Sequence, residues 1–227
     1  MRILIQARMN SKRLPGKVLR KINNTEMLLW TINRLRRLNN FFKLAVITSK
    51  ETSDDPIENF CKINSIDIYR GSLNNVAERF IDACMFFKAN SFVRICADSP
   101  FIDPLIVSEA VEIYQNNNFD LVTNVQTRTF PKGQSVEVVK LSAMKKIINS
   151  NNLTNEHLEH PTKLFYEYPD LFSIKNFVCE KSGLEKIQLS IDFYEDYILA
   201  NKIASSKELL YLSWYDILNL YTKNSYS

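Results

Sequence analysis

The sequence predicts an α/β fold with a mostly parallel central sheet. Short runs rich in β-branched residues alternate with segments in which apolar residues recur at helical spacing. Strand-helix-strand alternation is typical of parallel sheets, because parallel neighbours need a crossover connection that is usually a helix. At 227 residues and 45% hydrophobic, the chain can bury one sizeable core, so we expect a single domain over residues 1–227.

Each predicted element has a local signal. Runs of β-branched and apolar residues predict strands near 2–6, 43–48, 66–69, 92–96, 119–123 and 135–139. Helical spacing predicts helices near 25–38, 54–64, 74–89 and 104–117. The apolar stripes of the first and third helices, which include Leu28, Ile32, Phe80 and Cys84, are interpreted as core. After residue 125 the alternation loosens, and Asn-rich patches at 116–118 and 149–152 are interpreted as loops.

Composition argues against several classes of function. A net charge of +4, from 29 Lys and Arg against 25 Asp and Glu, is too mild to indicate a nucleic-acid partner. No run approaches the ~18 apolar residues of a membrane span, and Ile3-Leu4-Ile5 is too short for a signal core. The four cysteines form no CxxC pair and are interpreted as buried reduced thiols. We therefore expect a soluble, cytoplasmic protein with no membrane and no nucleic-acid partner.

The most informative segment is QARMNSKRLPGKVL at 6–19, directly after the first predicted strand. It places Arg8, Lys12, Arg13 and Lys17 within ten residues, and Leu14-Pro15-Gly16 breaks the chain into a turn. Converging cations and backbone N–H groups favour a phosphate-binding loop, although any surface loop of a basic protein can collect cations. The preceding strand favours a ligand site, since ligands bind at the carboxyl ends of strands in open α/β sheets. The Walker P-loop pattern is absent.

A second chemical cluster is a pair of aspartates. Asp98 follows the strand predicted at 92–96, so it lies at the same edge of the sheet as the cationic loop. A carboxylate beside phosphate needs an intervening cation, usually Mg²⁺; the alternative is an aspartate that caps the next turn. Asp192 is its expected partner, because the short β-like run at 189–191 also ends in an acid.

The segment ARMNSKRLPGKVL at 7–19 resembles the opening of the CTP-dependent cytidylyltransferases of the spore-coat-polysaccharide type. Further segments match the same family in order over roughly residues 1–200, which makes the resemblance more specific than one motif. They are DDPI at 54–57, YRGSLNNVAERF at 69–80, VRICADSPFIDP at 93–104, VTN at 122–124, FPKGQSVEVV at 130–139, NEH at 155–157 and LSIDFYEDY at 189–197. Relatives include the 3-deoxy-manno-octulosonate and acylneuraminate cytidylyltransferases, so the resemblance implies a Rossmann-like nucleotidyltransferase sandwich.

The resemblance implies roles for the two clusters. Arg8, Arg13 and Lys17 would steady the triphosphate of CTP, while Asp98 and Asp192 would hold Mg²⁺, and these five are the predicted catalytic residues. The predicted nucleotide-binding residues are Ala7, Arg8, Arg13, Lys17, Gly71, Asn75, Arg79 and Ala97.

Two of these nucleotide contacts carry structural alternatives, and a third departs from the family pattern. Asn75 and Arg79 lie one helical turn apart after Gly71, where the resemblance places the cytidine; a surface cap and a solvated arginine are the structural alternatives. The family often has glycine where this chain has Ala97, and the extra methyl group narrows the space for ribose.

The acceptor side is less regular. Relatives cover the acceptor with the segment that here holds Asn124, Arg128, Lys132, Gln134 and Glu137, and a Glu-His pair follows at Glu156 and His157. A zinc site around 156–160 is disfavoured because HExxH order is absent. Residues 125–185 are expected to form a small subdomain for covering the acceptor or for dimerisation, and the sequence allows a homodimer without requiring one.

Together these features predict a Mg²⁺-dependent cytidylyltransferase that joins CMP from CTP to an acidic sugar or related anionic acceptor and releases pyrophosphate, in the synthesis of surface polysaccharide precursors. A nucleotidyltransferase of the same fold that uses another NTP or a sugar-1-phosphate is the nearer alternative. A non-catalytic nucleotide- or RNA-binding module is the remoter one. Asp98 and Asp192 disfavour it, because carboxylates weaken simple anion binding.

Overall fold

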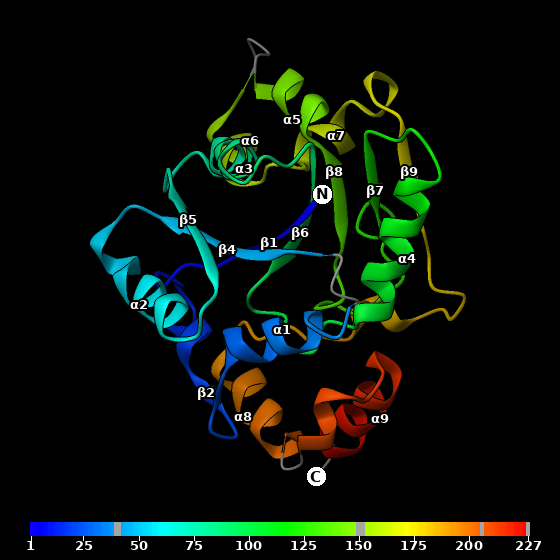
Figure 1. Cartoon of the computed structure of the whole chain (residues 1–227). Coiled ribbons are helices and arrows are strands. Elements are labelled where there is room, and N and C mark those ends of the chain that lie inside the picture. Colours follow the sequence, from blue (N-terminus) through cyan, green and yellow to red (C-terminus); the bar gives the residue numbers. More distant parts are fainter. Residues whose placement is uncertain (39–41, 149–152, 205–206, 226–227) are drawn as a thin grey trace.

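The computed structural model describes residues 1–38, 42–148, 153–204 and 207–225, and it has a central sheet with helices on both faces (Figure 1). In this part of the chain the main sheet has seven strands in the order β5-β4-β1-β6-β8-β7-β9. They are β1 (Arg2–Gln6), β4 (Leu44–Ser49), β5 (Asp67–Gly71), β6 (Ser91–Cys96), β7 (Leu121–Thr123), β8 (Glu137–Lys140) and β9 (Ile174–Asn176).

The sheet is mostly parallel, as predicted. β5, β4, β1 and β6 run parallel, while β8 is antiparallel to both β6 and β7, and β9 pairs parallel with β7. The six predicted strands all form, with bounds within two residues of the predicted ones. The sequence did not indicate β9, because its three residues are at least partly exposed and only Ile174 is apolar.

Helices alternate with the strands in the first half of the chain and dominate its end. They are α1 (Met27–Leu35), α2 (Asp55–Ile63), α3 (Val76–Phe86), α4 (Pro104–Gln115), α5 (Leu141–Ile148), α6 (Asn155–Glu159), α7 (Lys163–Glu167), α8 (Tyr194–Ile203) and α9 (Trp214–Ser225). Single 3-10 turns are η1 (Lys17–Leu19), η2 (Thr52–Asp54), η3 (Pro169–Leu171), η4 (Leu184–Lys186) and η5 (Lys207–Leu210). No helix among the described residues is long and apolar enough to cross a membrane.

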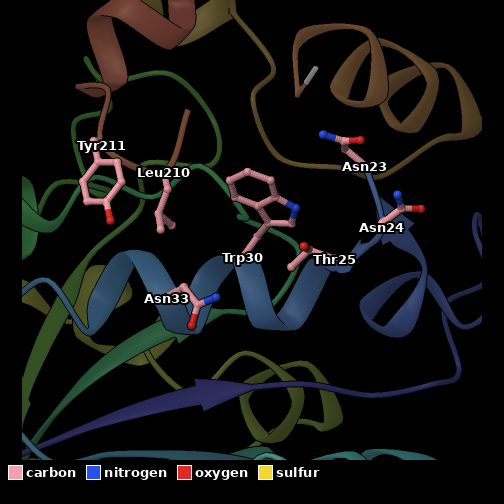
Figure 2. A pocket seen from close by; sticks show the side chains of 7 residues that line it. All are labelled: Asn23, Asn24, Thr25, Trp30, Asn33, Leu210 and Tyr211. Atoms are coloured by element: carbon pink, nitrogen blue, oxygen red, sulfur yellow. The ribbon is translucent and has the colours of Figure 1, made fainter. Parts of the chain in front are cut away.

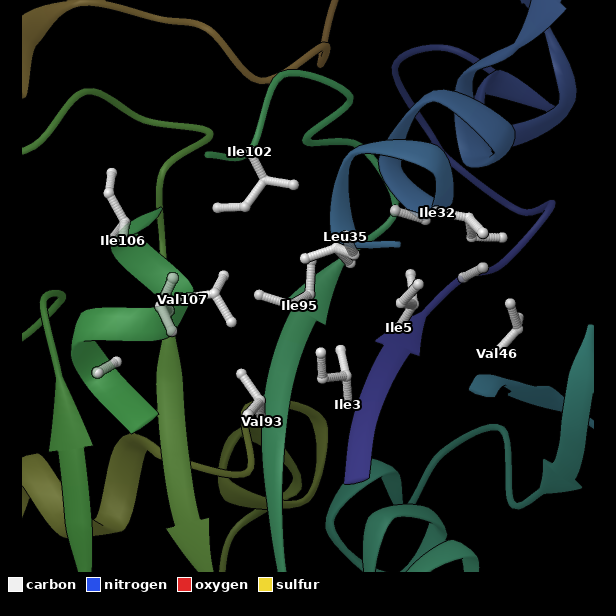
Figure 3. Close-up of a cluster of buried hydrophobic side chains, with 14 of the residues drawn as sticks. Ile3, Ile5, Ile32, Leu35, Val46, Val93, Ile95, Ile102, Ile106 and Val107 are labelled. Atoms are coloured by element: carbon white, nitrogen blue, oxygen red, sulfur yellow. The ribbon is translucent and has the colours of Figure 1, made fainter. Parts of the chain in front are cut away.

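The two faces of the sheet bury separate apolar clusters. Because side chains alternate along a strand, Ile3 and Ile5 of β1 point to the face covered by α1, α2 and α4, as Figure 3 shows for residues of α1 and α4. Leu4 points to the opposite face, where α3, α5 and α7 pack. The two predicted core stripes belong to different clusters. Leu28 and Ile32 of α1 lie in the first cluster, and Phe80 and Cys84 of α3 lie in the second.

The first predicted helix begins two residues later than expected, at Met27. The chain predicted as helical at 25–26 instead forms a small hairpin of β2 (Lys21–Ile22) and β3 (Thr25–Glu26). Asn23 and Asn24 lie in its turn with φ of 45° and 66°, a conformation that asparagine tolerates better than most residues. The loop predicted at 116–118 is present, whereas the one at 149–152 lies outside the described residues.

A third layer of α8, α9 and η5 packs beneath α1, at the bottom of Figure 1. Arg34 of α1 is fully buried there and donates to the carbonyl oxygens of Ile102, Leu209 and Leu212 at 2.7–2.9 Å. Burial lowers the pKa of Arg34 to about 10, which still leaves it charged at neutral pH. This side chain joins α1 to both the chain before α4 and the C-terminal layer.

The turn at 131–134 holds the segment that leads to Asp192. The backbone of Lys132 donates to Ile187 at 2.9 Å and accepts from Leu189 and Ser190 at 2.8 and 3.1 Å. A Cβ on Gly133 would lie 2.6 Å from the backbone nitrogen of Ser190, so only glycine permits this approach. The amide of Gln134 bonds the backbone of Phe101 and Asp103 at 2.8 and 2.9 Å, which fixes the turn to the chain after β6.

Residues 125–185, expected as a small subdomain, belong partly to the main body. β8 pairs with β6 and β7 inside the sheet, and α5 contributes Ala143, Met144 and Ile147 to the core. Within this range, we propose that α6 and α7 cover the acceptor.

We expect Gly133→Ala to destabilise the protein more than Gly183→Ala, although both glycines have positive φ, of 96° and 80°. An added Cβ at Gly183 has nothing within 4 Å among the described residues, so that variant reports backbone strain alone, about 1–2 kcal/mol. The overlap at Gly133 should add about 1–3 kcal/mol. Urea denaturation of both variants measures this difference, and equal losses would mean that the close approach to Ser190 carries no cost.

Candidate active site

The loops after β1 and β6 meet where the strand order reverses. From β1 the chain goes outward to β4 and β5, then returns to place β6 on the other side of β1. The carboxyl ends of such neighbouring strands form a crevice in which open α/β sheets bind ligands. A cavity of about 590 Å³ lies there, lined by residues that include Gln6, Arg8, Lys12, Arg13, Lys17, Cys96, Ala97, Asp98, Glu159, His160 and Asp192. All five predicted catalytic residues line this cavity.

Lys17 lies between the two predicted metal ligands. Its Nζ donates to Asp98 Oδ2 at 2.8 Å, to Asp192 Oδ1 at 3.0 Å and to the carbonyl oxygen of Ile191 at 2.8 Å. These three acceptors satisfy the three donors of an ammonium group. Burial alone would lower the pKa of Lys17, but attraction to Asp98 and Asp192 outweighs it and raises the pKa above its ordinary 10.5. Lys17 therefore stays charged at neutral pH.

Asp192 is held on both carboxylate oxygens. Its Oδ1 also accepts from Arg13 Nη2 at 2.6 Å, and its Oδ2 accepts from Gln188 Nε2 at 3.0 Å. Burial would raise the pKa of Asp192, but the charges of Lys17 and Arg13 and the Gln188 hydrogen bond lower it below its ordinary 3.8. Sequence reasoning missed Gln188; period-two spacing from 188 through 190 to 192 is the signal that could have indicated it.

Backbone contacts bring the cationic loop and both aspartates to one place. Gly16, with φ of 68°, donates to the carbonyl of Met9 at 2.9 Å and closes the loop just before Lys17. Buried Asp54 accepts from the backbone of Met9 at 2.7 Å and from the Ser49 hydroxyl at 2.5 Å, which ties the loop to the end of β4. Within the motif at 54–57, Asp54 therefore serves to position the cationic loop.

The side chains of Asp98 and Asp192 fit a magnesium ion. Both carboxylates already converge on one cation, the Lys17 ammonium, so their oxygens face a common point. Mg²⁺ in phosphate-binding sites uses one or two carboxylates together with phosphate oxygens. Among the described residues no group of three or more His, Cys, Asp or Glu side chains gathers as a metal site. An Mg²⁺ ion held by this pair would therefore complete its shell with phosphate and water.

The predicted cytidine contacts lie beside a second cavity. Asn75 caps α3 by accepting from the backbone of Glu78 at 2.9 Å, as its structural alternative supposed. The alternative for Arg79, a solvated arginine, is wrong. Its side chain is fully buried and donates to the carbonyl of Ser72 at 2.7 Å. A Cβ on Gly71 would lie 2.8 Å from Arg79 Cγ, so glycine makes room for the arginine stem. Burial, with the nearby charge of Arg8, lowers the Arg79 pKa to about 10.

This second cavity, of about 390 Å³, opens between the loop before α3 and helix α6. It is lined by Arg8, Leu73, Asn74, Asn155, Leu158 and Glu159. Arg8 and Glu159 line the first cavity as well, and their side chains pair at 3.5 Å, so the two cavities adjoin. Helix α6 therefore borders the predicted nucleotide side of the site. Ala7 and Ala97 are buried at the ends of β1 and β6, and Ala97 lines the first cavity.

Of the predicted acceptor residues, several are engaged within the protein. The Asn124 amide is buried and bonds the backbone of Gln134 and Val136 at 2.7 and 2.9 Å. Lys132 and Gln134 build the turn that holds the 187–192 segment. Lys132 and Gln134, within the motif at 130–139, therefore help to position Asp192. Sequence reasoning had instead assigned them to contact with the acceptor.

The remaining predicted acceptor residues lie in two charged networks. Glu137 is 2% exposed, pairs with Arg94 and accepts from the Tyr166 hydroxyl, while Arg128 donates to Ser135 Oγ at 3.1 Å. On α6, Glu156 pairs with Lys163 at 2.5 Å and His157 Nε2 lies 2.7 Å from Glu167. Glu137 therefore lies beside Asn124 through the pairing of β7 with β8, whereas Glu156 and His157 bond within α6 and α7.

A third cavity, of about 630 Å³, lies away from these charges, between the β2–β3 turn, α1 and η5 (Figure 2). It is lined by Asn23, Asn24, Thr25, Trp30, Asn33, Leu210 and Tyr211. These lining residues include no carboxylate and no cation.

The chain is similar in sequence to a known family and to curated proteins. A family model described as cytidylyltransferase matches residues 2–213. The chain is 31% identical over 224 residues to an uncharacterized protein of Methanocaldococcus jannaschii, covering 97% of this chain and 90% of that protein. It is 29% identical over 201 residues to the spore coat polysaccharide biosynthesis protein SpsF of Bacillus subtilis, covering 86% and 82% respectively.

Solved structures share the fold. A cytidylyltransferase from Leptospira borgpetersenii matches with a TM-score of 0.90 and 32% identity, over 99% of this chain and 94% of that chain. CMP:2-keto-3-deoxy-manno-octonic acid synthetase, solved with CTP, matches with a TM-score of 0.67 at 15% identity, over 89% and 97%, which shows the fold alone. These matches confirm the resemblance and the α/β nucleotidyltransferase fold predicted from the sequence.

The ion pairs of Asp192 predict a pH dependence of stability. Because its pKa is lowered in the folded protein, its contribution is present above the ordinary 3.8 and is lost as pH falls through the folded value. Asp192→Asn should therefore cost about 1–3 kcal/mol of unfolding free energy at neutral pH, and this difference should shrink below pH ~4. Urea denaturation at neutral and acid pH measures it. Exposed Asp170→Asn is the control, and a difference independent of pH would contradict the assignment.

Proposed function

Because the chain belongs to the cytidylyltransferase family, we propose that it transfers CMP from CTP to an acidic sugar or related anionic acceptor and releases pyrophosphate. The observation that carries the proposal is the convergence of Lys17, Asp98 and Asp192 in the crevice beside Arg8 and Arg13. Cations there suit a triphosphate, and paired carboxylates suit the divalent ion that accompanies it.

The reaction requires the protein to position the reactants and to neutralise the charge of the phosphates. An acceptor oxygen forms a bond to the α-phosphorus of CTP as the bond to the bridging oxygen breaks, and the electron pair leaves with pyrophosphate. Arg8, Lys12 and Arg13 line the cavity and would bind the phosphates, neutralising charge that builds on the leaving group. Mg²⁺ held by Asp98 and Asp192 would supply further neutralisation of the phosphate oxygens.

The nucleoside end of CTP fits the smaller cavity. Asn74 and Asn155 line it from opposite sides, and an amide can both donate to and accept from the edge of a cytosine ring. Arg79 is buried beneath the loop before α3 and donates to the Ser72 carbonyl. It would therefore influence base binding indirectly, by fixing the conformation of this loop. Base preference would follow because a wrong base leaves these polar groups unpaired.

The acceptor would approach from the side of α6 and α7. Glu159 and His160 line the main cavity where α6 ends, and α7 begins shortly afterwards in the chain at Lys163. The similarity to SpsF supports a role in polysaccharide precursor synthesis. A cytoplasmic location, where CTP is available, fits cysteines such as Cys61, whose burial raises its pKa to about 12 and keeps it an unreactive thiol.

The proposal is tested by incubating the protein with each of four NTPs and a panel of sugar acids and phosphorylated acceptors, with and without Mg²⁺. We expect acceptor-dependent pyrophosphate release with CTP and Mg²⁺ only. Release with another NTP would favour the alternative nucleotidyltransferase. Binding of RNA with steep salt dependence and no pyrophosphate from any NTP would favour the binding module instead.

We expect Asp98→Asn and Asp192→Asn each to reduce turnover by about 10² or more, because each removes one charged ligand from the metal position. Turnover is measured over a Mg²⁺ titration together with thermal melting, which separates lost activity from lost fold. Asp170→Asn, at an exposed position on η3, is the matched control and should be silent. Full turnover in either site variant would remove that aspartate from the mechanism.

A further inference from the structure

The Lys17 ammonium has no donor left for a substrate. Its three N–H groups are taken by Asp98, Asp192 and the carbonyl of Ile191, at 2.8, 3.0 and 2.8 Å. The side chain is 9% exposed, so water cannot readily replace these partners. Lys17 can therefore bind a phosphate oxygen only by releasing at least one of them.

The same contacts occupy the metal position. Asp98 Oδ2 and Asp192 Oδ1 face the ammonium, and Arg13 shares Asp192 Oδ1, so a divalent ion that bridges the two carboxylates through these facing oxygens meets both cations. Two positive groups cannot share that space, because the ion would repel the ammonium at close range in a partly buried site. The metal and the ammonium therefore compete for one position.

We propose that Lys17 is a built-in counter-ion that keeps metal out of the site until the nucleotide arrives. The triphosphate gives the ammonium new acceptors, so Lys17 leaves the carboxylates, and Asp98 and Asp192 become available to the metal that accompanies the nucleotide. Metal and nucleotide then enter as one cooperative unit, and each strengthens binding of the other by the same factor. This inference rests on the proposed function.

Lys17 suits this role better than the other cations of the loop. Arg13 is 53% exposed, so solvent screens its charge, and besides lying over the Phe193 ring it pairs with Asp192 but not with Asp98 in the described structure. Lys17 contacts both, begins η1 directly after Gly16, and carries a flexible four-carbon stem that can redirect the ammonium without moving the backbone.

The first test is direct Mn²⁺ binding, followed by electron paramagnetic resonance. Wild-type protein alone should bind Mn²⁺ weakly, and a CTP analogue with a methylene bridge between the α- and β-phosphorus should tighten binding by about tenfold or more. Lys17→Met should bind Mn²⁺ about tenfold more tightly than wild type without the analogue. Lys21→Met removes the same charge outside the site and should match wild type.

A second readout is thermal melting. Lys17→Met removes the ammonium that pairs with Asp98 and leaves Asp192 paired with Arg13 alone, so its Tm should fall, and Mn²⁺ should raise its Tm more than that of wild type. The double variant Lys17→Met, Asp98→Asn should lose the gain in Mn²⁺ affinity, which places the ion at this pair.

Equal Mn²⁺ affinity of wild type with and without the analogue would overturn the proposal, whatever the folding of the variant. Tighter Mn²⁺ binding by wild type than by Lys17→Met would overturn it as well. If pyrophosphate release still requires Mg²⁺ and CTP in either case, the proposed function stands while the counter-ion role fails. No metal binding in any state together with no pyrophosphate release would instead reject both.

Discussion

The contact on which the site depends is one buried ammonium shared by two carboxylates. Lys17, Asp98 and Asp192 come from three distant parts of the chain, after β1, after β6 and before α8. A buried charge without a partner is costly, so the three segments are stable in this arrangement only together. The surrounding scaffold can be understood as the means by which a sheet delivers these groups to one point.

The scaffold does so mostly through backbone contacts. Ile191 donates to the carbonyl of Asp98 at 2.9 Å, which sets the two aspartates side by side, and the turn around Gly133 holds the 187–190 segment through backbone hydrogen bonds of Lys132. Asp54 holds the cationic loop from the other side. Positions set by backbone hydrogen bonds vary little, and transfer chemistry that relies on placed charge needs that precision.

Local signals explain why the first 120 residues were predictable. Each parallel strand and its crossover helix has its own apolar pattern, and the acids and cations follow strand ends, where topology gathers them. Contacts made across the chain left no such signal. The Gln188–Asp192 bond, the Gln134 bridge to Phe101 and the burial of Arg79 depend on tertiary packing. Sequence reasoning therefore placed Gln134 with the acceptor and, although it assigned Arg79 to the nucleotide, did not indicate that this side chain is buried.

The charge states of the site also bear on how the acceptor loses its proton. A raised pKa keeps Lys17 protonated, a lowered pKa keeps Asp192 ionised, and burial raises the pKa of Cys96 to about 11, so it stays a thiol. Lys17 and Cys96 hold protons that neutral water does not remove, and Asp192 is too weak a base to hold one. Glu159 and His160 line the same cavity, and we propose them as candidates for the general base.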